Sequence, residues 1–538
     1  MVNAPAPGAF ERPQWDALAQ LTIGELIDQR ARQMPFRMAL SAHSIGGWRD
    51  RLSYAQLALH ARSMGAGLAQ LSVKRGERVA VSLGNDAGRE AVLTALGCFA
   101  VGAIVVPMNV RSSDDELEHA FTLVKPALVV TVKAAAARLR RMTPAAFVFV
   151  DAAPGDDACW PDPARRELGT QGLPPSSSTP DDPACFLFTS GTTSRSKAVM
   201  HSHRSMIAAG FAMGCSVGLG PADLYQGAFP FFTSSCLNLG CMSAWVHGAG
   251  FVMEEWLDNA KRLCLIETEC STVYHGVPSV IQFMLDEYQA GAQRGLRSVR
   301  RLAYGGAAMP VATIQRIERV WPWMEQVQVW GMTESGPAGA WLAPQYLPQK
   351  AGSIGRAMPN CELKVIDESG REVAAGELGE LCFQGPSMAL GYYDNPDESA
   401  MAFRDGWLHT GDVVVQDQDG LLRFVDRRKD VINRGGLKIS SAAVEAALYR
   451  FPGVQEAAVI AVPHPRLGED VAACVVGRPG ANLDVPTMQA HCERLLAEYE
   501  VPRHWFVMEA LPKNPMGKIL KRELHTLITE RSHSNDDK

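Results

Sequence analysis

Short apolar strands alternate with helical patterns along the chain, and this alternation is the feature that most restricts its fold. Clear strand candidates lie at residues 78–82, 127–131 and 146–150, each rich in Val, Ala, Leu or Phe. Helical patterns between them favour a layered α/β architecture with mostly parallel sheets. Because 538 residues are too many for one compact core, the sequence predicts at least two domains.

One apolar segment, residues 91–108, is long enough to suggest a membrane-spanning helix. Two glycines and a proline interrupt it, which is typical of a helix that turns into a strand. We therefore expect a buried helix over residues 90–100, a strand over residues 103–106 and no integral membrane contact.

Composition and charge exclude several classes of protein. A hydrophobic content of 47% and a charged content of 20% are typical of a globular enzyme. The net charge of −6 and the lack of a dense Lys/Arg run argue against nucleic-acid binding. The 12 cysteines have no zinc-ligand spacing, and residues 1–15 do not resemble a signal peptide. We expect reduced thiols and a cytoplasmic location.

A loop of small hydroxyl residues follows an apolar strand at residues 184–188 and ends at Lys197. Such a loop can turn backbone N–H groups and hydroxyls toward a polyphosphate, and the lysine adds positive charge. The G-x-x-x-x-G-K-[ST] spacing of the common phosphate loop is absent. Since most loops of this composition are only connections, the phosphate hypothesis depends on motifs further along the chain.

Five such motifs follow in order. They are Trp330-Gly331-Met332-Thr333-Glu334, His409-Thr410-Gly411-Asp412, Asp426-Arg427-Arg428-Lys429-Asp430, Arg434-Gly435-Gly436-Leu437-Lys438 and Asn514-Pro515-Met516-Gly517-Lys518. Together they resemble the motifs of the adenylate-forming (AMP-binding) superfamily, which holds acyl- and aryl-CoA synthetases, amino-acid-adenylating domains and beetle luciferases. The resemblance extends from about Ile23 to Leu524.

The resemblance implies two domains and a two-step reaction. An N-terminal AMP- and acyl-binding domain would cover residues 1–426, and a small mobile α+β domain residues 427–538, with a hinge near Lys429. A carboxylic acid would attack the α-phosphate of ATP to give acyl-AMP and pyrophosphate. The thiol of CoA would then displace AMP. ATP, Mg²⁺ and CoA are thus the expected small-molecule partners.

The same resemblance assigns roles to the motif residues. Lys518 would bridge the acyl carboxylate and the α-phosphate, Glu334 would hold Mg²⁺, and Thr333 would lie near the α-phosphate. The remaining nucleotide contacts would come from Thr189, Ser190, Gly191, Thr192, Thr193 and Lys197 for the β- and γ-phosphates, Gly305, Gly306, Ala307 and Trp330 for adenine, and Asp412 and Arg427 for ribose and phosphate. Trp330 stands where the family usually has Tyr.

The phosphate loop departs from the family pattern at three positions. Ser194 and Ala198 stand where Gly is usual, and Ser196 where Pro is usual. If position 194 needs a positive φ, serine would cost about 1 kcal/mol of strain.

The resemblance implies that the segment 434–438 guides the thiol of CoA. Gly435 and Gly436 allow close backbone approach, and Lys438 either meets a CoA phosphate or is solvated. Ser440 or Ser441 is expected to cap a helix over residues 442–449.

The acyl pocket is the least constrained part of the prediction. The resemblance places it among Phe232, Thr233, Ser235, Tyr304, Val329 and Met332. Many CoA synthetases have His where Thr233 stands, and amino-acid-adenylating domains have Asp there. Because threonine cannot pair with a buried ammonium group, an amino-acid substrate is disfavoured. With Val329 on one side and small serines on the other, we expect an apolar acid that is medium-chain, alicyclic or aromatic. His275 is interpreted as a core residue.

Two alternatives stay open. The enzyme could pass its acyl group to the phosphopantetheine of a carrier protein. It could also be a non-catalytic nucleotide- or acyl-binding relative, as the departures at Ser194 and Thr233 suggest. The presence of Lys518, Glu334 and Asp412 argues against loss of catalysis.

Overall fold

The structure is a computed structural model that describes residues 15–153, 156, 158–162, 178–189, 196–255, 258–291, 295–347, 349–513 and 519–536. The chain forms two compact units. The first comprises the described residues within Met1–Thr189, Ser196–Leu363 and Phe383–Leu408, and the second those within Lys364–Cys382 and His409–Lys538.

The first unit contains a nine-stranded sheet. Its strands follow the order β15 (Arg356–Ala357), β14 (Ala340–Leu342), β13 (Glu325–Trp330), β12 (Arg301–Tyr304), β11 (Val273–Gly276), β9 (Leu224–Gly227), β10 (Gly250–Met253), β1 (Met38–His43) and β2 (Arg49–Ser53). The strands from β13 to β1 are parallel, so the carboxyl ends of β9, β11, β12 and β13 meet at one edge.

The first unit also contains a seven-stranded sheet. Its order is β18 (Gly391–Tyr392), β8 (Lys197–Ser202), β7 (Pro183–Thr189), β4 (Ile104–Pro107), β3 (Arg78–Val81), β5 (Leu128–Thr131) and β6 (Ala146–Phe149). The strands β7, β4, β3, β5 and β6 are parallel, while β8 runs antiparallel to β7 and β18 antiparallel to β8. The two-residue β18 thus attaches a distant segment of the chain to the edge of this sheet.

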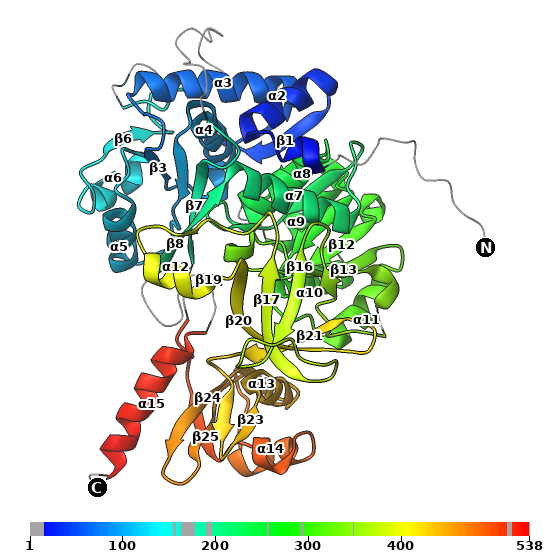
Figure 1. The fold of residues 1–538 in the computed structure, drawn as a ribbon. Coiled ribbons are helices and arrows are strands. Elements are labelled where there is room, and N and C mark those ends of the chain that lie inside the picture. Colours follow the sequence, from blue (N-terminus) through cyan, green and yellow to red (C-terminus); the bar gives the residue numbers. More distant parts are fainter. Residues whose placement is uncertain are drawn as a thin grey trace, which may run out of the picture. The chain divides into compact units, whose positions relative to one another are not determined.

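Helices cover both sheets in layers (Figure 1). The main hydrophobic core joins both sheets through residues of α2 (Ile23–Gln33), α3 (Tyr54–Gln70), α4 (Gly88–Val101), α7 (His203–Val217) and α8 (Met242–Val246). A second core packs the nine-stranded sheet against α9 (Asn259–Glu269), α10 (Pro278–Gln289) and α11 (Val311–Val320). A third packs the seven-stranded sheet against α5 (Asp114–Val124) and α6 (Lys133–Leu139). The short α1 (Trp15–Leu18) and α12 (Pro396–Ala402) complete this unit.

A five-stranded sheet is built from later parts of the chain. Its strands are β16 (Glu362–Ile366), β17 (Leu378–Gln384), β20 (Trp407–Gln416) and β19 (Phe403–Arg404), with β21 (Leu422–Arg427) beside β20.

The C-terminal part of the second unit has a sheet of its own. Its order is β23 (Leu437–Ile439), β22 (Ile432–Arg434), β25 (Gly468–Gly477) and β24 (Val454–His464), with β26 (His504–Met508) beside β25. Helices α13 (Ser441–Tyr449) and α14 (Val485–Glu493) contribute to the core on this sheet, and α15 (Lys521–Asp536) contributes residues to a second small core.

These elements confirm the predicted α/β class with mostly parallel sheets. The apolar segment folds as the helix α4 followed by the strand β4, as predicted. No helix within the described ranges is long and apolar enough to cross a membrane. The units divide the chain at other positions than residue 426, so the predicted domain boundary and the hinge at Lys429 stay predictions.

Candidate active site

Glu334 lies in a one-turn helix, η4 (Thr333–Ser335), directly after the carboxyl end of β13. The hydroxyl of Ser335 accepts a hydrogen bond from the backbone N–H of Met332 at 3.1 Å and so closes the turn. The hydroxyl of Ser387 donates to the carbonyl of Ser335 at 2.8 Å. The turn therefore holds Glu334 in a fixed, buried position.

One oxygen of the Glu334 carboxylate accepts a hydrogen bond. The hydroxyl of Tyr392, on β18, donates to its Oε1 at 3.0 Å. Burial, with the negative charge of Glu334 as the next cause, raises the pKa of Tyr392, so this residue stays a phenol that can donate. The arrangement orients the carboxylate and suits it to bind a hard cation such as Mg²⁺ through oxygen.

Lys197 opens β8 and reaches the same region. Its register partner across the ladder is Thr189 at the end of β7, so the two ends of the predicted phosphate loop are paired. The Nζ atom lies 2.5 Å from Oε2 of Glu398 and 4.7 Å from the centre of the Tyr392 ring. The predicted loop residues between them, Ser190, Gly191, Thr192 and Thr193, and the departure at Ser194, lie outside the described residues.

The other two departures from the family pattern have simple surroundings. Ala198 is a buried strand residue of β8 opposite Phe188, and extended backbone needs no glycine. The carbonyl of Ser196 lies 2.9 Å from Nε2 of His119, which ties the loop end to α5.

The predicted adenine-binding residues lie at adjoining strand ends. Gly305 follows β12, and a Cβ atom there would lie 2.6 Å from the carbonyl oxygen of Val329. Gly306 has φ of +80°, which favours glycine, and Ala307 is exposed. Trp330 ends the neighbouring strand β13. The structure thus brings 305–307 and Trp330 to the same edge of the nine-stranded sheet.

His201, which the sequence analysis missed, supports Thr333. Its Nε2 atom lies 2.9 Å from the carbonyl of Thr333. Burial lowers the pKa of His201 to about 4, so the ring is neutral at neutral pH. No motif marks this residue, because its partner is distant in the sequence.

The segment of the predicted acyl pocket touches the same turn. The hydroxyls of Ser234 and Thr333 are 3.3 Å apart. The hydroxyl of Thr233 donates to the carbonyl of Pro230 at 2.7 Å and so closes its own turn. Phe232 is buried, and Ser235 begins a π-helix, η2 (Ser235–Cys241).

Asn85 fixes the beginning of that segment. Its Nδ2 donates to the carbonyls of Phe229 at 2.9 Å and Glu254 at 2.6 Å, while its Oδ1 accepts from the N–H of Phe231 at 2.8 Å. The buried amide therefore binds the acyl-pocket segment to the end of β10.

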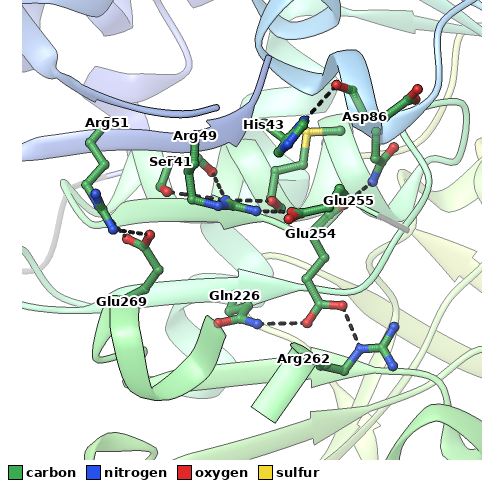
Figure 2. A network of polar contacts seen from close by, with 12 residues as sticks. Ser41, His43, Arg49, Arg51, Asp86, Gln226, Glu254, Glu255, Arg262 and Glu269 are labelled. Carbon is green, nitrogen blue, oxygen red and sulfur yellow. Dashed lines mark hydrogen bonds and ion pairs between the residues drawn. The ribbon is translucent and has the colours of Figure 1, made fainter. Parts of the chain in front are cut away.

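Glu254 is itself fully engaged, as Figure 2 shows. Its two carboxylate oxygens accept from Gln226 and from Arg262, both at 2.7 Å. A buried carboxylate satisfied in this way is a structural group, so we do not assign it a catalytic role.

The remaining residues of the predicted acyl pocket lie in different parts of the first unit. Val329 belongs to the main core, while Tyr304 packs in the second core and donates to Gln326 at 3.3 Å. Tyr304 and Val329 thus face opposite sides of the sheet, and a pocket that uses both must lie beyond the strand ends. Met332, next to η4, is half-buried there. His275 is a core residue, with Nδ1 at 2.5 Å from the hydroxyl of Tyr225.

In the second unit, Asp412 and Arg427 form a pair. They are register partners on β20 and β21, and Nε of Arg427 lies 2.6 Å from Oδ1 of the buried Asp412. Lys429 lies in the turn after β21. The ion pair holds both proposed ribose contacts in one place.

The predicted CoA-contacting residues form a hairpin turn. Gly435 and Gly436 have φ of +59° and +92° between β22 and β23. Lys438 is exposed, with Nζ at 3.7 Å from Oε1 of Glu368, so both interpretations of this lysine stay open.

Lys518 lies outside the described residues. A nearby lysine, Lys521, already has a structural role, because it pairs with Glu445 at 2.7 Å and donates to Ser441 at 2.6 Å.

The described residues contain no group of three or more His, Cys, Asp or Glu side chains that could hold a metal ion. Magnesium ions bound with nucleotides usually take several of their ligands from phosphate oxygens and water, so a single carboxylate such as that of Glu334 can suffice on the protein side.

Comparison with known families agrees with this site. The model of the AMP-binding enzyme family matches residues 27–393, and that of the AMP-binding enzyme C-terminal domain matches residues 443–518.

Curated relatives match along nearly their whole length. The chain is 31% identical to the sulfoacetate–CoA ligase of Cupriavidus necator, over 94% of this chain and 97% of the relative. It is 32% identical to a feruloyl-CoA synthase of Amycolatopsis sp, over 93% of this chain and 98% of the relative. Among solved structures, one similar protein is the O-succinylbenzoate coenzyme A synthetase of Bacillus subtilis with its acyl-adenylate intermediate. The TM-score is 0.83 at 25% sequence identity, over 93% of this chain and 97% of the solved chain. The same enzyme has also been solved with ATP and a magnesium ion.

Proposed function

The chain belongs to the AMP-binding enzyme family, and we propose that it is an ATP- and Mg²⁺-dependent acid:CoA ligase that forms an acyl-AMP intermediate. The observation that carries this proposal is the group Lys197, Tyr392 and Glu334, which places a cation and an oriented carboxylate within reach of one ring. The relatives that are named for sulfoacetate and for feruloyl-CoA act on quite different acids and share CoA as the acceptor, whereas a further relative is named as a fatty acid–acyl-carrier-protein ligase.

Polyphosphate binding falls to the first unit. Lys197 would neutralise charge on the β- and γ-phosphates, and Thr189 would place the loop backbone beside them. Glu334, with its Oε1 held by Tyr392, would bind the magnesium ion that accompanies ATP. When bound, this ion withdraws charge from the phosphate oxygens. Two anions, the acid and ATP, can then approach each other.

Each unit, taken by itself, offers groups that suit one part of a nucleotide. Gly305 and Gly306 present backbone to adenine beside the indole of Trp330, which offers a flat apolar face. Asp412, oriented by Arg427, has the right chemistry to accept hydrogen bonds from ribose hydroxyls. Lys518 would supply the charge that joins the acyl carboxylate to the α-phosphate.

The acid would bind beside Thr333, between the segment that Asn85 fixes and the ends of β12 and β13. The hydroxyl of Thr233 donates to the backbone carbonyl of Pro230 and carries no negative charge, so it cannot neutralise a buried ammonium group. We infer an apolar acid that is medium-chain, alicyclic or aromatic.

The decisive experiment measures pyrophosphate release and acyl-CoA formation with fatty acids of several lengths, cyclohexane carboxylate, benzoate and cinnamates. Lys518→Ala should lower the rate of adenylation by about 10²–10³-fold, because it removes charge at the reacting centre. Lys513→Ala is the matched control, since its amine pairs with Glu456 of the same unit. Adenylate that accumulates without discharge by free CoA would refute the CoA assignment. If no acid gave pyrophosphate release with ATP, the proposal that the protein is a ligase would be refuted.

A further inference from the structure

Glu398, which no sequence motif marks as functional, faces the amine of Lys197. The two groups are 2.5 Å apart, although the residues are 201 positions apart in the chain. Glu398 is held in place by its own helix, because Asn395 caps α12 and accepts a hydrogen bond from the Glu398 N–H at 3.3 Å. The backbone of Glu398 is thus held at the start of α12, within reach of Lys197.

The pair is only partly buried, with side-chain exposures of 19% for Lys197 and 38% for Glu398. Ion pairs of this exposure are weak, because water screens the charges and competes for them. A triphosphate offers the same ammonium group several negative charges at once. Lys197 can therefore leave Glu398 for a polyphosphate at little cost.

Tyr392 keeps the cation separate from the carboxylate of Glu334. Its ring face lies 4.7 Å from Nζ of Lys197, and its hydroxyl is committed to Oε1 of Glu334. Of the two carboxylates near this ring, it is Glu398 that pairs with Lys197 in the structure. Glu334 is thus available to a metal ion.

We propose that Glu398 is the exchangeable counter-ion of Lys197. The polyphosphate of ATP displaces it, and it takes Lys197 back as pyrophosphate leaves. Glu398 is a positioning residue, since it acts through Lys197, and the inference rests on the proposed polyphosphate role of Lys197. It lowers the affinity for ATP and for pyrophosphate alike, and so favours product release.

The test is calorimetric binding of Mg-ATP and, separately, Mg-pyrophosphate to the full-length protein. Glu398→Gln and Glu398→Ala should each bind both ligands about three- to tenfold more tightly, because a competing and repelling charge is lost. Damage to the fold cannot produce such a gain. Asp397→Asn is the matched control, because this substitution also removes one negative charge from α12. Asp397 is exposed and makes no ion pair with any residue that the structure describes.

The pairwise origin is checked in a Lys197→Gln background, where Glu398→Gln should improve binding by a clearly smaller factor, because only the repulsion between Glu398 and the polyphosphate is then removed. Unchanged or weaker binding by both Glu398 variants would overturn the inference, as would an equal gain in Asp397→Asn. If the unaltered protein bound neither ligand, the proposed function itself would fail, which separates the two failures. Product inhibition by pyrophosphate gives a second readout and should strengthen by the same factor in Glu398→Gln.

Discussion

At the scale of single residues, Tyr392 contacts two groups of opposite charge. Its ring faces the amine of Lys197, and its hydroxyl donates to the carboxylate of Glu334. Because burial raises the pKa of Tyr392, the hydroxyl stays protonated at neutral pH and can donate to Glu334. Two functional groups that would otherwise neutralise each other can therefore lie in one small region.

Replacing Tyr392 with Phe should raise the Mg²⁺ concentration needed for half-maximal adenylation about tenfold. The buried carboxylate loses a hydrogen bond to a charged group, which is worth about 1.5–3 kcal/mol. A magnesium titration of pyrophosphate release measures this. Tyr393→Phe is the control, since that ring packs on Phe186. An unchanged magnesium requirement in Tyr392→Phe would show that the hydrogen bond does not orient Glu334.

The sequence indicated Glu334 and Lys197 through motifs, but not Tyr392, His201 or Glu398. Their roles come from contacts between segments that lie 58 to 201 positions apart. Local patterns carry no signal for such contacts. The Asn395-Pro396 pair predicts the start of a helix, yet nothing local predicts which residue its first turn faces.

At the scale of elements, the ends of β12 and β13 define the adenine region by close packing. Gly305→Ala should weaken AMP binding at least tenfold, because the added Cβ meets the carbonyl oxygen of Val329 at 2.6 Å and overpacking costs about 1–3 kcal/mol. Ala290→Ser, at an exposed position after α10, is the control. Equilibrium binding of AMP is the measurement.

A double variant distinguishes the effect of the Val329 side chain on position 305 from that of the Val329 carbonyl. In Gly305→Ala with Val329→Ala, the clash with the valine methyl is relieved, but the carbonyl oxygen stays. We expect no recovery of AMP binding. Full recovery would mean that only the valine side chain restricts position 305.

Helix α13 offers a test of local stability. The sequence left Ser440 and Ser441 as alternative caps, and the structure assigns the cap to Ser440, whose hydroxyl accepts from the N–H of Ala443 at 3.0 Å. Ser440→Ala should lower the free energy of unfolding of the second unit by about 1 kcal/mol. Denaturant unfolding measures this, and Ser440→Thr, which can still cap the helix and still donate to the carbonyl of Val425, should retain most of the stability.

The strands and helices with strong periodic patterns were predictable. The strands at β3, β5, β6 and β7 and the α4–β4 connection lie within one or two residues of their predicted positions. The two-residue β18 was not predictable, because so short a strand has no pattern and exists only through its pairing with β8.

At the scale of the whole molecule, buried neutral histidines predict the response to acid. Burial lowers the pKa of His201 and of His203 to about 4 and that of His275 to about 3. In the unfolded chain these rings take up protons near pH 6.5. The unfolded state therefore binds more protons than the folded state below that pH.

Stability should thus be complete above about pH 6.5 and fall steadily as the pH drops toward 4, by several kcal/mol in total, since each unit of pKa difference is worth about 1.4 kcal/mol. Thermal unfolding across this range measures the slope. His275→Gln should flatten it, while His504→Gln, at an exposed position, should not. A slope that is equal in all three proteins would contradict this prediction.

The attachment of β18 to β8 has a consequence for synthesis on the ribosome. The outer edge of β8 has no partner until residues 391 and 392 have left the exit tunnel, and an unpaired edge invites association with other chains. The same late segment brings Tyr392 and Glu398 to residues made some 200 codons earlier. A nascent chain that stalls before this point carries Lys197 and Glu334 but neither of the groups that hold them apart.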